Sequence, residues 1–245
     1  METTDSKDDL VNNAGDFMPG ISIDCVIFGF HYSQLKVLLI GYGNSHNLSL
    51  AGGFVRRKED VDFAAKRIVQ ERTGLSVVNL RLVQFGVFGS KNRLNNGKVM
   101  QKVLKRLLNI TLKADHWLLQ RFITIGYYAL VDFTKAKASN NIFSESCEWH
   151  DINNRPKLMF DHDKILNQAL LSLRQSLDIH LKQLRYLLPE TFTMNELQGV
   201  YETIMNEKVL RPSFQRKILS MNILERLDKR WTGQAHKAPY LYRFI

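Results

Sequence analysis

The order of apolar and polar residues predicts several β-strands in the first half of the chain. Apolar side chains dominate residues 21–30 and 36–40, and the short stretch 31–34 between them predicts a hairpin. Two further stretches, 82–85 and 122–132, contain β-branched and aromatic residues of the kind that strands favour. We therefore expect these residues to build a sheet.

One stretch between these strands has the character of a helix. Residues 64–71 tolerate helical structure well, and Gly74 follows where a left-handed C-terminal cap is expected. Residues 52–54, just before it, are predicted to form a loop. Strands arranged around one long helix are typical of a mixed α/β sandwich.

The C-terminal part has a different pattern, which predicts a pair of helices. Thr193 and Glu196 fit a capping box, and apolar residues then recur at helical spacing. Pro212 suits the first turn of a second helix, residues 213–221. Leu188 and Pro189 are expected to close a long helix starting at Lys164 and to mark the boundary before this part.

A predicted hairpin follows the two helices. Residues 223–230 and 239–244 are expected to be strands, joined by the loop 231–238. Helix, short turn, basic helix and basic hairpin together predict a winged helix-turn-helix. In such a domain the second helix enters the major groove of DNA and the hairpin lies along the backbone.

The charge distribution supports a nucleic-acid partner. The formal net charge is +10, and residues 211–243 contain eight basic residues against two acidic ones. Gln215 and Arg216 would read base edges, because these side chains form paired hydrogen bonds with adenine and guanine. The full set of predicted DNA-binding residues is Thr193, Arg211, Ser213, Gln215, Arg216, Lys217, Lys229, Arg230 and Lys237.

Composition limits the remaining possibilities. The 245 residues, 44% of them hydrophobic, suit one or two globular domains, and no apolar run is long enough to span a bilayer. Residues 1–19 are polar and acidic, which predicts a disordered leader and not a secretory signal. Cys25 and Cys147 are expected to be buried free thiols in a reducing cytoplasm.

A motif in the first half resembles the Nudix box, G-x5-E-x7-R-E-U-x-E-E-x-G-U, where U is aliphatic. The matching positions are Gly53, Glu59, Arg67, Val69, Glu71, Gly74 and Leu75. Ile68 and Arg72 stand where the pattern has glutamate. On a helix the side chains of residues 68, 71 and 72 converge on one patch, which in Nudix enzymes holds carboxylates around magnesium. The box is therefore predicted to be catalytically degenerate, with Gly53, Glu59, Arg67 and Glu71 as remnants and no metal or other cofactor.

A short acidic cluster lies beyond the predicted strands. Asp161, His162 and Asp163 resemble metal ligands, but no second cluster accompanies them. Asp161 or Asp163 is instead expected to cap the helix that starts at Lys164.

Most of the chain is similar to the bacterial Nudix-related transcriptional regulators. The resemblance rests on the box and on residues 160–166, 192–198, 214–218 and 241–244. It implies an α/β fold, a Nudix α/β/α sandwich followed by a C-terminal winged helix-turn-helix domain. The implied domains are residues 20–186 and 187–245, after the leader 1–19.

The resemblance also implies a function. Family members include repressors that sense ADP-ribose and regulators that respond to arabinose, and they bind palindromic operators as dimers. We therefore expect a cytoplasmic homodimer that binds double-stranded operator DNA as a repressor and does not contact membranes. A sugar such as arabinose, or a nucleotide sugar such as ADP-ribose, would be the effector, with Phe54, Arg57, Phe88 and Arg93 as predicted contacts.

Residues 95–121 are interpreted as an insertion relative to this family. Residues 91–121 contain eight basic residues and one acidic residue, and leucines recur there at roughly helical spacing. Three roles remain open: a surface helix packed on the core, a dimer contact, or an additional DNA contact. Two other functions also remain open, a magnesium-dependent hydrolase of ADP-ribose-like substrates and a protein-interaction module that uses the basic insertion helix.

Overall fold

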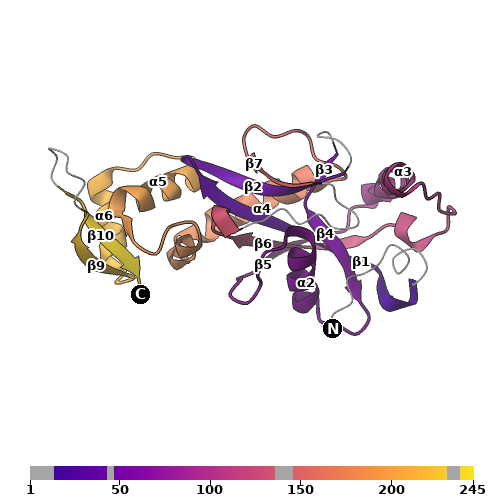
Figure 1. Ribbon diagram of the computed structural model, residues 1–245, viewed down its shortest axis with the longest axis horizontal. Coiled ribbons are helices and arrows are strands. Elements are labelled where there is room, and N and C mark those ends of the chain that lie inside the picture. Colours follow the sequence, from indigo (N-terminus) through magenta and orange to yellow (C-terminus); the bar gives the residue numbers. More distant parts are fainter. Residues whose placement is uncertain (1–13, 43–46, 136–145, 231–237) are drawn as a thin grey trace.

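The computed structural model of the chain describes residues 14–42, 47–135, 146–230 and 238–245 (Figure 1). The molecule is elongated, with a sheet and two helices in the middle and smaller units at the two ends. The strands of the middle part are β1 (Phe17–His31), β2 (Gln34–Gly41), β3 (Leu48–Ser49), β4 (Ala51–Arg56), β5 (Val83–Phe88), β6 (Ile123–Leu130) and β7 (Ser146–Asp151). The two helices of the middle part are α2 (Val61–Thr73) and α4 (His162–Leu177), and α3 (Asn96–Leu108) lies at one end of the molecule. Short 3-10 helices also occur: η1 (Ala14–Asp16), η2 (Lys91–Asn95), η3 (Trp117–Leu119), η4 (Phe133–Lys135) and η5 (Leu181–Tyr186).

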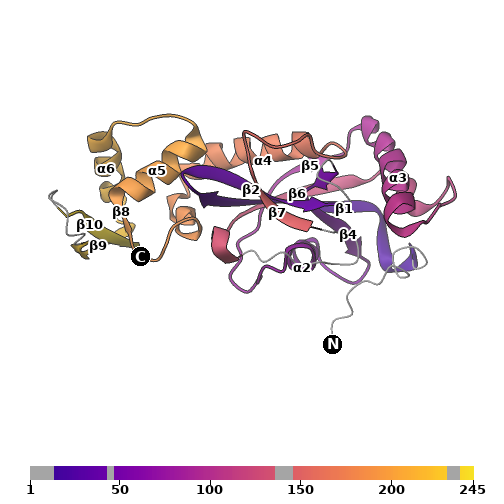
Figure 2. The ribbon, with the colours of Figure 1, turned by 45° about the horizontal axis from the view of Figure 1, so that its top comes forward.

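β1 is the centre of this sheet. It runs antiparallel to β2 and β4 along one edge and parallel to β6 along the other, and β5 pairs with β6. α2 covers one face of the sheet and α4 covers the other (Figure 2). Alternate residues of β1 point to the two faces, so Ile27 joins the core under α2 and Phe28 joins the core under α4. The predicted α/β sandwich is confirmed.

α2 ends as its sequence predicts. Gly74 has a φ of 67°, and its backbone N–H donates to the carbonyl oxygen of Gln70, which closes the last turn. Gly53 faces this helix closely, since a Cβ at that position would lie 2.8 Å from Cγ1 of Ile68. The hydrocarbon of Ile68 is therefore a core side chain, with 1% of its surface exposed.

The C-terminal unit is formed by β8 (Phe192–Thr193), α5 (Met194–Met205), α6 (Arg211–Ser220), β9 (Leu224–Lys229) and β10 (Tyr240–Phe244). Its strands pair in the order β8-β10-β9. Thr193 and Glu196 form the predicted capping box at the start of α5. The core under α4 continues through Leu187 and Leu188 to Phe192 and the helices of this unit, across the predicted domain boundary. The predicted helix-turn-helix with a hairpin is confirmed.

The structure corrects four details. Residues 52–54 are part of β4 and not of a loop, because they pair with β1. Residues 14–19 do not belong to a leader: Phe17 is 2% exposed and stacks on Trp117 at 5.3 Å between ring centroids. β7 was not predicted, and its polar residues pair with β2. The long helix from Lys164 ends at Leu177, and residues 181–186 form η5 instead.

Two further predictions concern cysteines and membranes. Cys25 and Cys147 are buried free thiols, as expected. None of the helices in the described part of the chain has the length and apolar character that a bilayer crossing requires.

Candidate functional site

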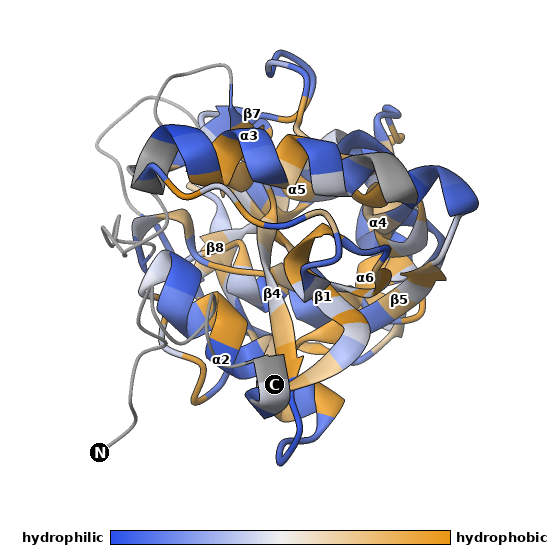
Figure 3. Cartoon of the chain, turned by 90° about the vertical axis from the view of Figure 1, so that its right-hand side faces the viewer, coloured by the Kyte–Doolittle hydropathy of each residue, from blue (hydrophilic) through white to orange (hydrophobic). Residues whose placement is uncertain are grey.

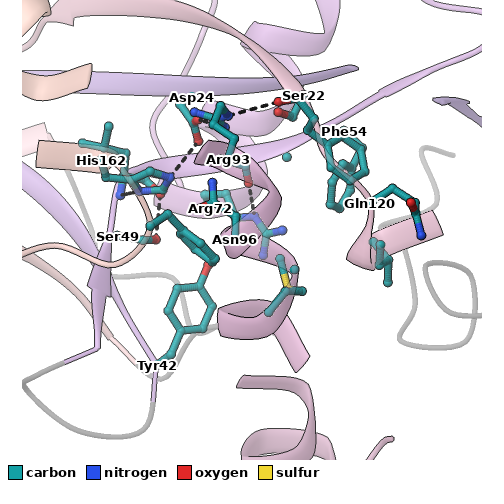
Figure 4. A pocket seen from close by; sticks show the side chains of 18 residues that line it. Ser22, Asp24, Tyr42, Ser49, Phe54, Arg72, Arg93, Asn96, Gln120 and His162 are labelled. Carbon is teal, nitrogen blue, oxygen red and sulfur yellow. Dashed lines mark hydrogen bonds and ion pairs between the residues drawn. The ribbon is translucent and has the colours of Figure 1, made fainter. Parts of the chain in front are cut away.

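A cavity of about 120 Å³ lies at one end of the sheet, beneath α3 (Figure 4). Its polar lining includes Asp24, Arg72, Arg93, Asn96 and His162. Its apolar lining includes Phe54, Met100, Leu118 and Phe122. A pocket with an apolar wall and a few converging polar groups is the usual form of a small-molecule site.

Arg93 holds the base of this pocket together. Its Nη1 donates to both oxygens of Asp161 at 2.7 Å, its Nη2 donates to Oγ1 of Thr124 at 2.7 Å, and its Nε donates to the carbonyl oxygen of Phe122 at 3.0 Å. Asp161 therefore accepts hydrogen bonds from an arginine and gives no side-chain cap to α4, which corrects one of the predicted capping roles.

His162 has a defined orientation in the pocket wall. Its Nδ1 accepts the backbone N–H of Leu50 at 2.9 Å, so Nε2 is the nitrogen that carries a proton. Burial lowers the pKa of His162, which keeps the imidazole neutral near neutral pH. Nε2 lies 3.4 Å from Oδ1 of Asp24.

Asp163, the third residue of the predicted acidic cluster, stabilises the loop before α4. Its carboxylate pairs with Arg155 and accepts the backbone N–H of Leu158 at 3.0 Å. In the described residues, no three His, Cys, Asp or Glu side chains are placed to hold a metal ion.

Residues 95–121, which the sequence predicts to be an insertion, supply part of the pocket wall. Gly97 in α3 touches η3 so closely that a Cβ there would lie 2.1 Å from the carbonyl oxygen of Leu119. Asn96 at the start of α3 donates to Asp161 at 3.4 Å, and Gln101 links α3 to Ile110 and Leu112. Figure 3 shows α3 lying across this end of the molecule with hydrophilic residues over much of its surface. Of the roles left open, packing on the α/β domain is the one that these contacts support.

The two carboxylates that remain in the box do not line the pocket. Arg67 donates to Oε2 of Glu59 and to Oε2 of Glu71, both at 3.0 Å, and to the carbonyl oxygen of Phe54 at 2.9 Å. Burial by itself would raise the pKa of Glu59, but the hydrogen bonds from Arg67 and from the backbone of Arg56 lower it. These residues brace α2 against β4. The set therefore does not fit a magnesium ion, which needs several free oxygen ligands.

Arg72 is the box position that does face the pocket. Its Nε donates to the carbonyl oxygen of Gly52 at 3.1 Å, and its side chain lines the cavity. A cation therefore stands where an active Nudix box has a carboxylate.

The predicted effector contacts are only partly brought together. Phe54 and Arg93 line the pocket. Arg57 is exposed, and its Nε donates to the carbonyl oxygen of Gly15, while Phe88 packs against Phe85 on the α4 side of the sheet, so neither lines the pocket. Asp24 also lines the pocket and was not among the predicted contacts, although an acidic residue inside an apolar strand is a signal that could have revealed it.

Those predicted DNA-binding residues that the structure describes belong to the C-terminal unit, which forms the other end of the molecule (Figure 1). Arg211, Ser213 and Arg216 are exposed, and Gln215 is half-buried. No acidic side chain in the described residues pairs with Arg211 or Arg216. Contact of these side chains with a DNA groove stays a prediction.

Other predicted DNA contacts have partners within the protein. The hydroxyl of Thr193 is used in the capping box, and Arg230 pairs with Glu196 at 3.0 Å. The Nζ of Lys229 lies 5.3 Å from the centre of the Tyr240 ring. Lys237 falls outside the described residues.

Lys217 connects α6 to the α/β domain. Its Nζ lies 2.6 Å from Oδ1 of Asp178, the residue that follows α4, and 5.4 Å from the centre of the Tyr201 ring. Tyr201 also donates to Asp178 at 3.0 Å, and the hydrogen bond from Lys217 lowers the pKa of Asp178. α4 thus begins in the wall of the pocket and ends at the helix that carries the basic face.

The fold defines a class of protein: a Nudix domain joined to a winged-helix domain. Comparison with known proteins supports each part. Residues 184–244 match the family model described as the NrtR DNA-binding winged helix domain. The chain is 29% identical over 234 residues to the ADPR responsive transcriptional repressor NtrR of Acinetobacter baylyi, across 92% of this chain and 82% of that protein.

Two other relatives extend the comparison. The ADP-ribose pyrophosphatase of Methanocaldococcus jannaschii is 30% identical over 155 residues, which cover 62% of this chain and 73% of that protein. The crystal structure of Shewanella oneidensis NrtR complexed with a 27mer DNA has the same fold, with a TM-score of 0.67 and 24% identity over 92% of this chain and 93% of that one. The chain belongs to the Nudix-related transcriptional regulators of the NrtR type.

Proposed function

We propose that the chain is a transcriptional repressor that binds operator DNA through its winged helix and binds ADP-ribose, without hydrolysing it, in the pocket beneath α3. The main support for this proposal is that Arg72 replaces a glutamate of the Nudix box, so that a positive charge faces the pocket. Arg72 faces the cavity, while Glu59 and Glu71 are held by Arg67 away from it. A guanidinium can bind a pyrophosphate directly, without a bridging metal.

The two ends of the molecule would act together. The DNA-binding helix α6 is tied through Lys217 to Asp178, and α4 reaches from there to His162 in the pocket wall. A ligand moves an equilibrium between two arrangements only by binding them with different affinity. Effector and DNA are then expected to alter each other's affinity by the same factor. A homodimer on a palindromic operator is part of this proposal.

A gel-shift titration tests the whole proposal. The purified protein is titrated against the intergenic DNA upstream of its own gene, with and without ADP-ribose, and with L-arabinose as the alternative sugar effector. A shifted band that ADP-ribose releases supports the proposal. A protein that binds this DNA no better than random DNA contradicts it.

Replacing Arg72 by Gln tests the role of the cation in the pocket. Removing a hydrogen bond to a charged group is expected to weaken ADP-ribose binding about tenfold. Isothermal titration calorimetry measures this change, and Arg81→Gln, which removes an exposed charge outside the pocket, is the matched control. Equal binding by the Arg72 variant and the wild type would show that this side chain does not hold the effector.

Replacing Asp178 by Asn tests the connection between the domains. The pair with Lys217 is half-exposed, so it is worth at most about 1 kcal/mol. Freed from this pair, Lys217 is expected to strengthen DNA binding by up to about fivefold and to make binding less sensitive to ADP-ribose. Glu225→Gln, which breaks the exposed pair with Arg243, is the control. The expectation fails if both variants respond to ADP-ribose as the wild type does.

Hydrolysis is the second candidate function, because the Methanocaldococcus relative is named as an ADP-ribose pyrophosphatase. It predicts turnover of ADP-ribose with magnesium at ordinary enzyme rates, and loss of this turnover in Glu71→Gln. The arginine contacts of Glu59 and Glu71 favour the regulator.

A further inference from the structure

Asp24 is a buried carboxylate that faces the pocket without an ordinary hydrogen bond. It lies on β1, 5% of its surface is exposed, and it lines the cavity. Nε2 of the neutral His162 lies 3.4 Å from Oδ1 of Asp24, and Nη2 of Arg93 lies 3.9 Å from Oδ2. Both distances exceed the usual 2.7–3.2 Å of an N–H···O bond. In the part of the chain that the structure describes, no hydrogen bond reaches this carboxylate.

The neighbouring groups are already committed elsewhere. Arg93 gives its hydrogen bonds to Asp161, Thr124 and a backbone carbonyl, and His162 is anchored by the N–H of Leu50. Figure 4 shows Asp24, His162 and Arg93 grouped on one side of the pocket, opposite Phe54 and Gln120. A buried polar group normally has a hydrogen-bond partner, since leaving it without one is costly. The missing donors are therefore expected to come from a ligand.

The backbone next to Asp24 leaves room for its carboxylate. A Cβ on Gly52 would lie 2.5 Å from Oδ1 of Asp24, and Gly52 is not in the left-handed region that would by itself require glycine. The absence of a side chain at this position thus keeps one oxygen of Asp24 accessible.

The charges in the pocket indicate which chemical group of a ligand Asp24 can bind. A carboxylate accepts hydrogen bonds and repels phosphate, so the anionic part of an effector would lie toward Arg72. The guanidinium groups of Arg72 and Arg93 in the same cavity disfavour a cationic ligand. Neutral hydroxyl groups remain, and two neighbouring hydroxyls match the two oxygens of a carboxylate.

We propose that Asp24 is a specificity-determining residue that binds the vicinal hydroxyl groups of a sugar in the effector. This inference rests on the proposed function, in which a sugar-containing effector occupies the pocket. It adds a defined subsite, with Asp24 held between His162 and Arg93 and with space provided by Gly52.

The test combines Asp24→Asn with changes in the ligand. Affinities of both proteins for ADP-ribose, 2′-deoxy-ADP-ribose and ADP are measured by calorimetry. The variant is expected to bind ADP-ribose about tenfold more weakly, as for loss of a charged hydrogen bond. If Asp24 binds the terminal ribose, the substitution should change the affinity for ADP, which lacks that ribose, very little. If Asp24 binds the ribose of the adenosine, the substitution should change the affinity for 2′-deoxy-ADP-ribose very little. Equal losses for all three ligands, or no loss, would overturn the proposal.

Two further variants separate binding from folding. Gly52→Ala is expected to displace the carboxylate and reproduce the ligand selectivity of Asp24→Asn. Asp62→Asn is the matched control, since Asp62 accepts from Tyr127 outside the pocket at 2.6 Å. Its ligand affinities should equal those of the wild type, and a selective loss of ADP-ribose affinity in this variant would overturn the assignment to Asp24.

Binding measurements on the wild-type protein distinguish a failure of the proposed function from a failure of the Asp24 subsite. A protein that binds no ADP-ribose lacks the proposed effector, and free D-ribose and L-arabinose then test the Asp24 subsite. Binding of either sugar, weakened about tenfold in Asp24→Asn, supports the subsite with a different effector. Binding of neither sugar overturns it.

Discussion

The variant Arg216→Glu is expected to lose at least about 100-fold in operator affinity. Arg216 lies on the exposed side of α6, and no acidic side chain among the described residues neutralises it. Losing one arginine contact to a base costs about 1–3 kcal/mol, and a dimer would lose two such contacts. The new carboxylate also repels the phosphates. Gel shifts at several salt concentrations would measure the affinity and the salt dependence.

The same charge change at the far end of the molecule provides the control. Lys102→Glu alters an exposed residue of α3, which lies opposite the winged helix (Figure 1). Its operator affinity is expected to stay within about twofold of the wild type, because exposed charges separated by more than a Debye length of about 8–10 Å are largely screened. If both variants lose operator affinity equally, α3 also contacts the DNA. If Arg216→Glu keeps the affinity and base preference of the wild type, α6 is not the helix that enters the groove.

Gly97→Val is expected to lower ADP-ribose affinity about 100-fold while operator binding persists. The Cβ at this position would lie 2.1 Å from the carbonyl oxygen of Leu119, and a backbone atom cannot rotate out of its way. α3 and η3 must then separate by about 1 Å, and a shift of this size in positioning groups costs about 100-fold in enzymes. Overpacking is also expected to lower the free energy of unfolding by about 1–3 kcal/mol.

Gly199 is the matched control for this helical glycine. It lies in α5, and a Cβ there would meet no atom within 4 Å. Gly199→Val is expected to leave ADP-ribose affinity unchanged and to alter stability by less than about 1 kcal/mol. Calorimetry and thermal unfolding of the two variants decide the matter. If Gly97→Val binds ADP-ribose as well as Gly199→Val does, the segment 95–121 is not a wall of the effector site.

Local sequence rules predicted the elements that depend on local chemistry. Gly74 ends α2 because a residue without a Cβ adopts the left-handed cap conformation at little cost. The capping box at Thr193 and the proline at the start of α6 fixed the helices of the winged helix in the same way. β7 escaped prediction because its residues, SCEWHD, lack a clear alternation, and only pairing with β2 makes them a strand.

In the site, too, some features follow from the sequence and others only from the tertiary structure. The sequence alone determined that Ile68 and Arg72 replace two glutamates of the box, and that a basic helix-and-hairpin unit follows it. Only the tertiary structure decided which carboxylate faces the pocket. It placed Glu59 and Glu71 against Arg67, and it brought Asp24, Arg93 and His162 together from three distant segments. Such contacts depend on how strands and helices pack, which no local spacing of residues encodes.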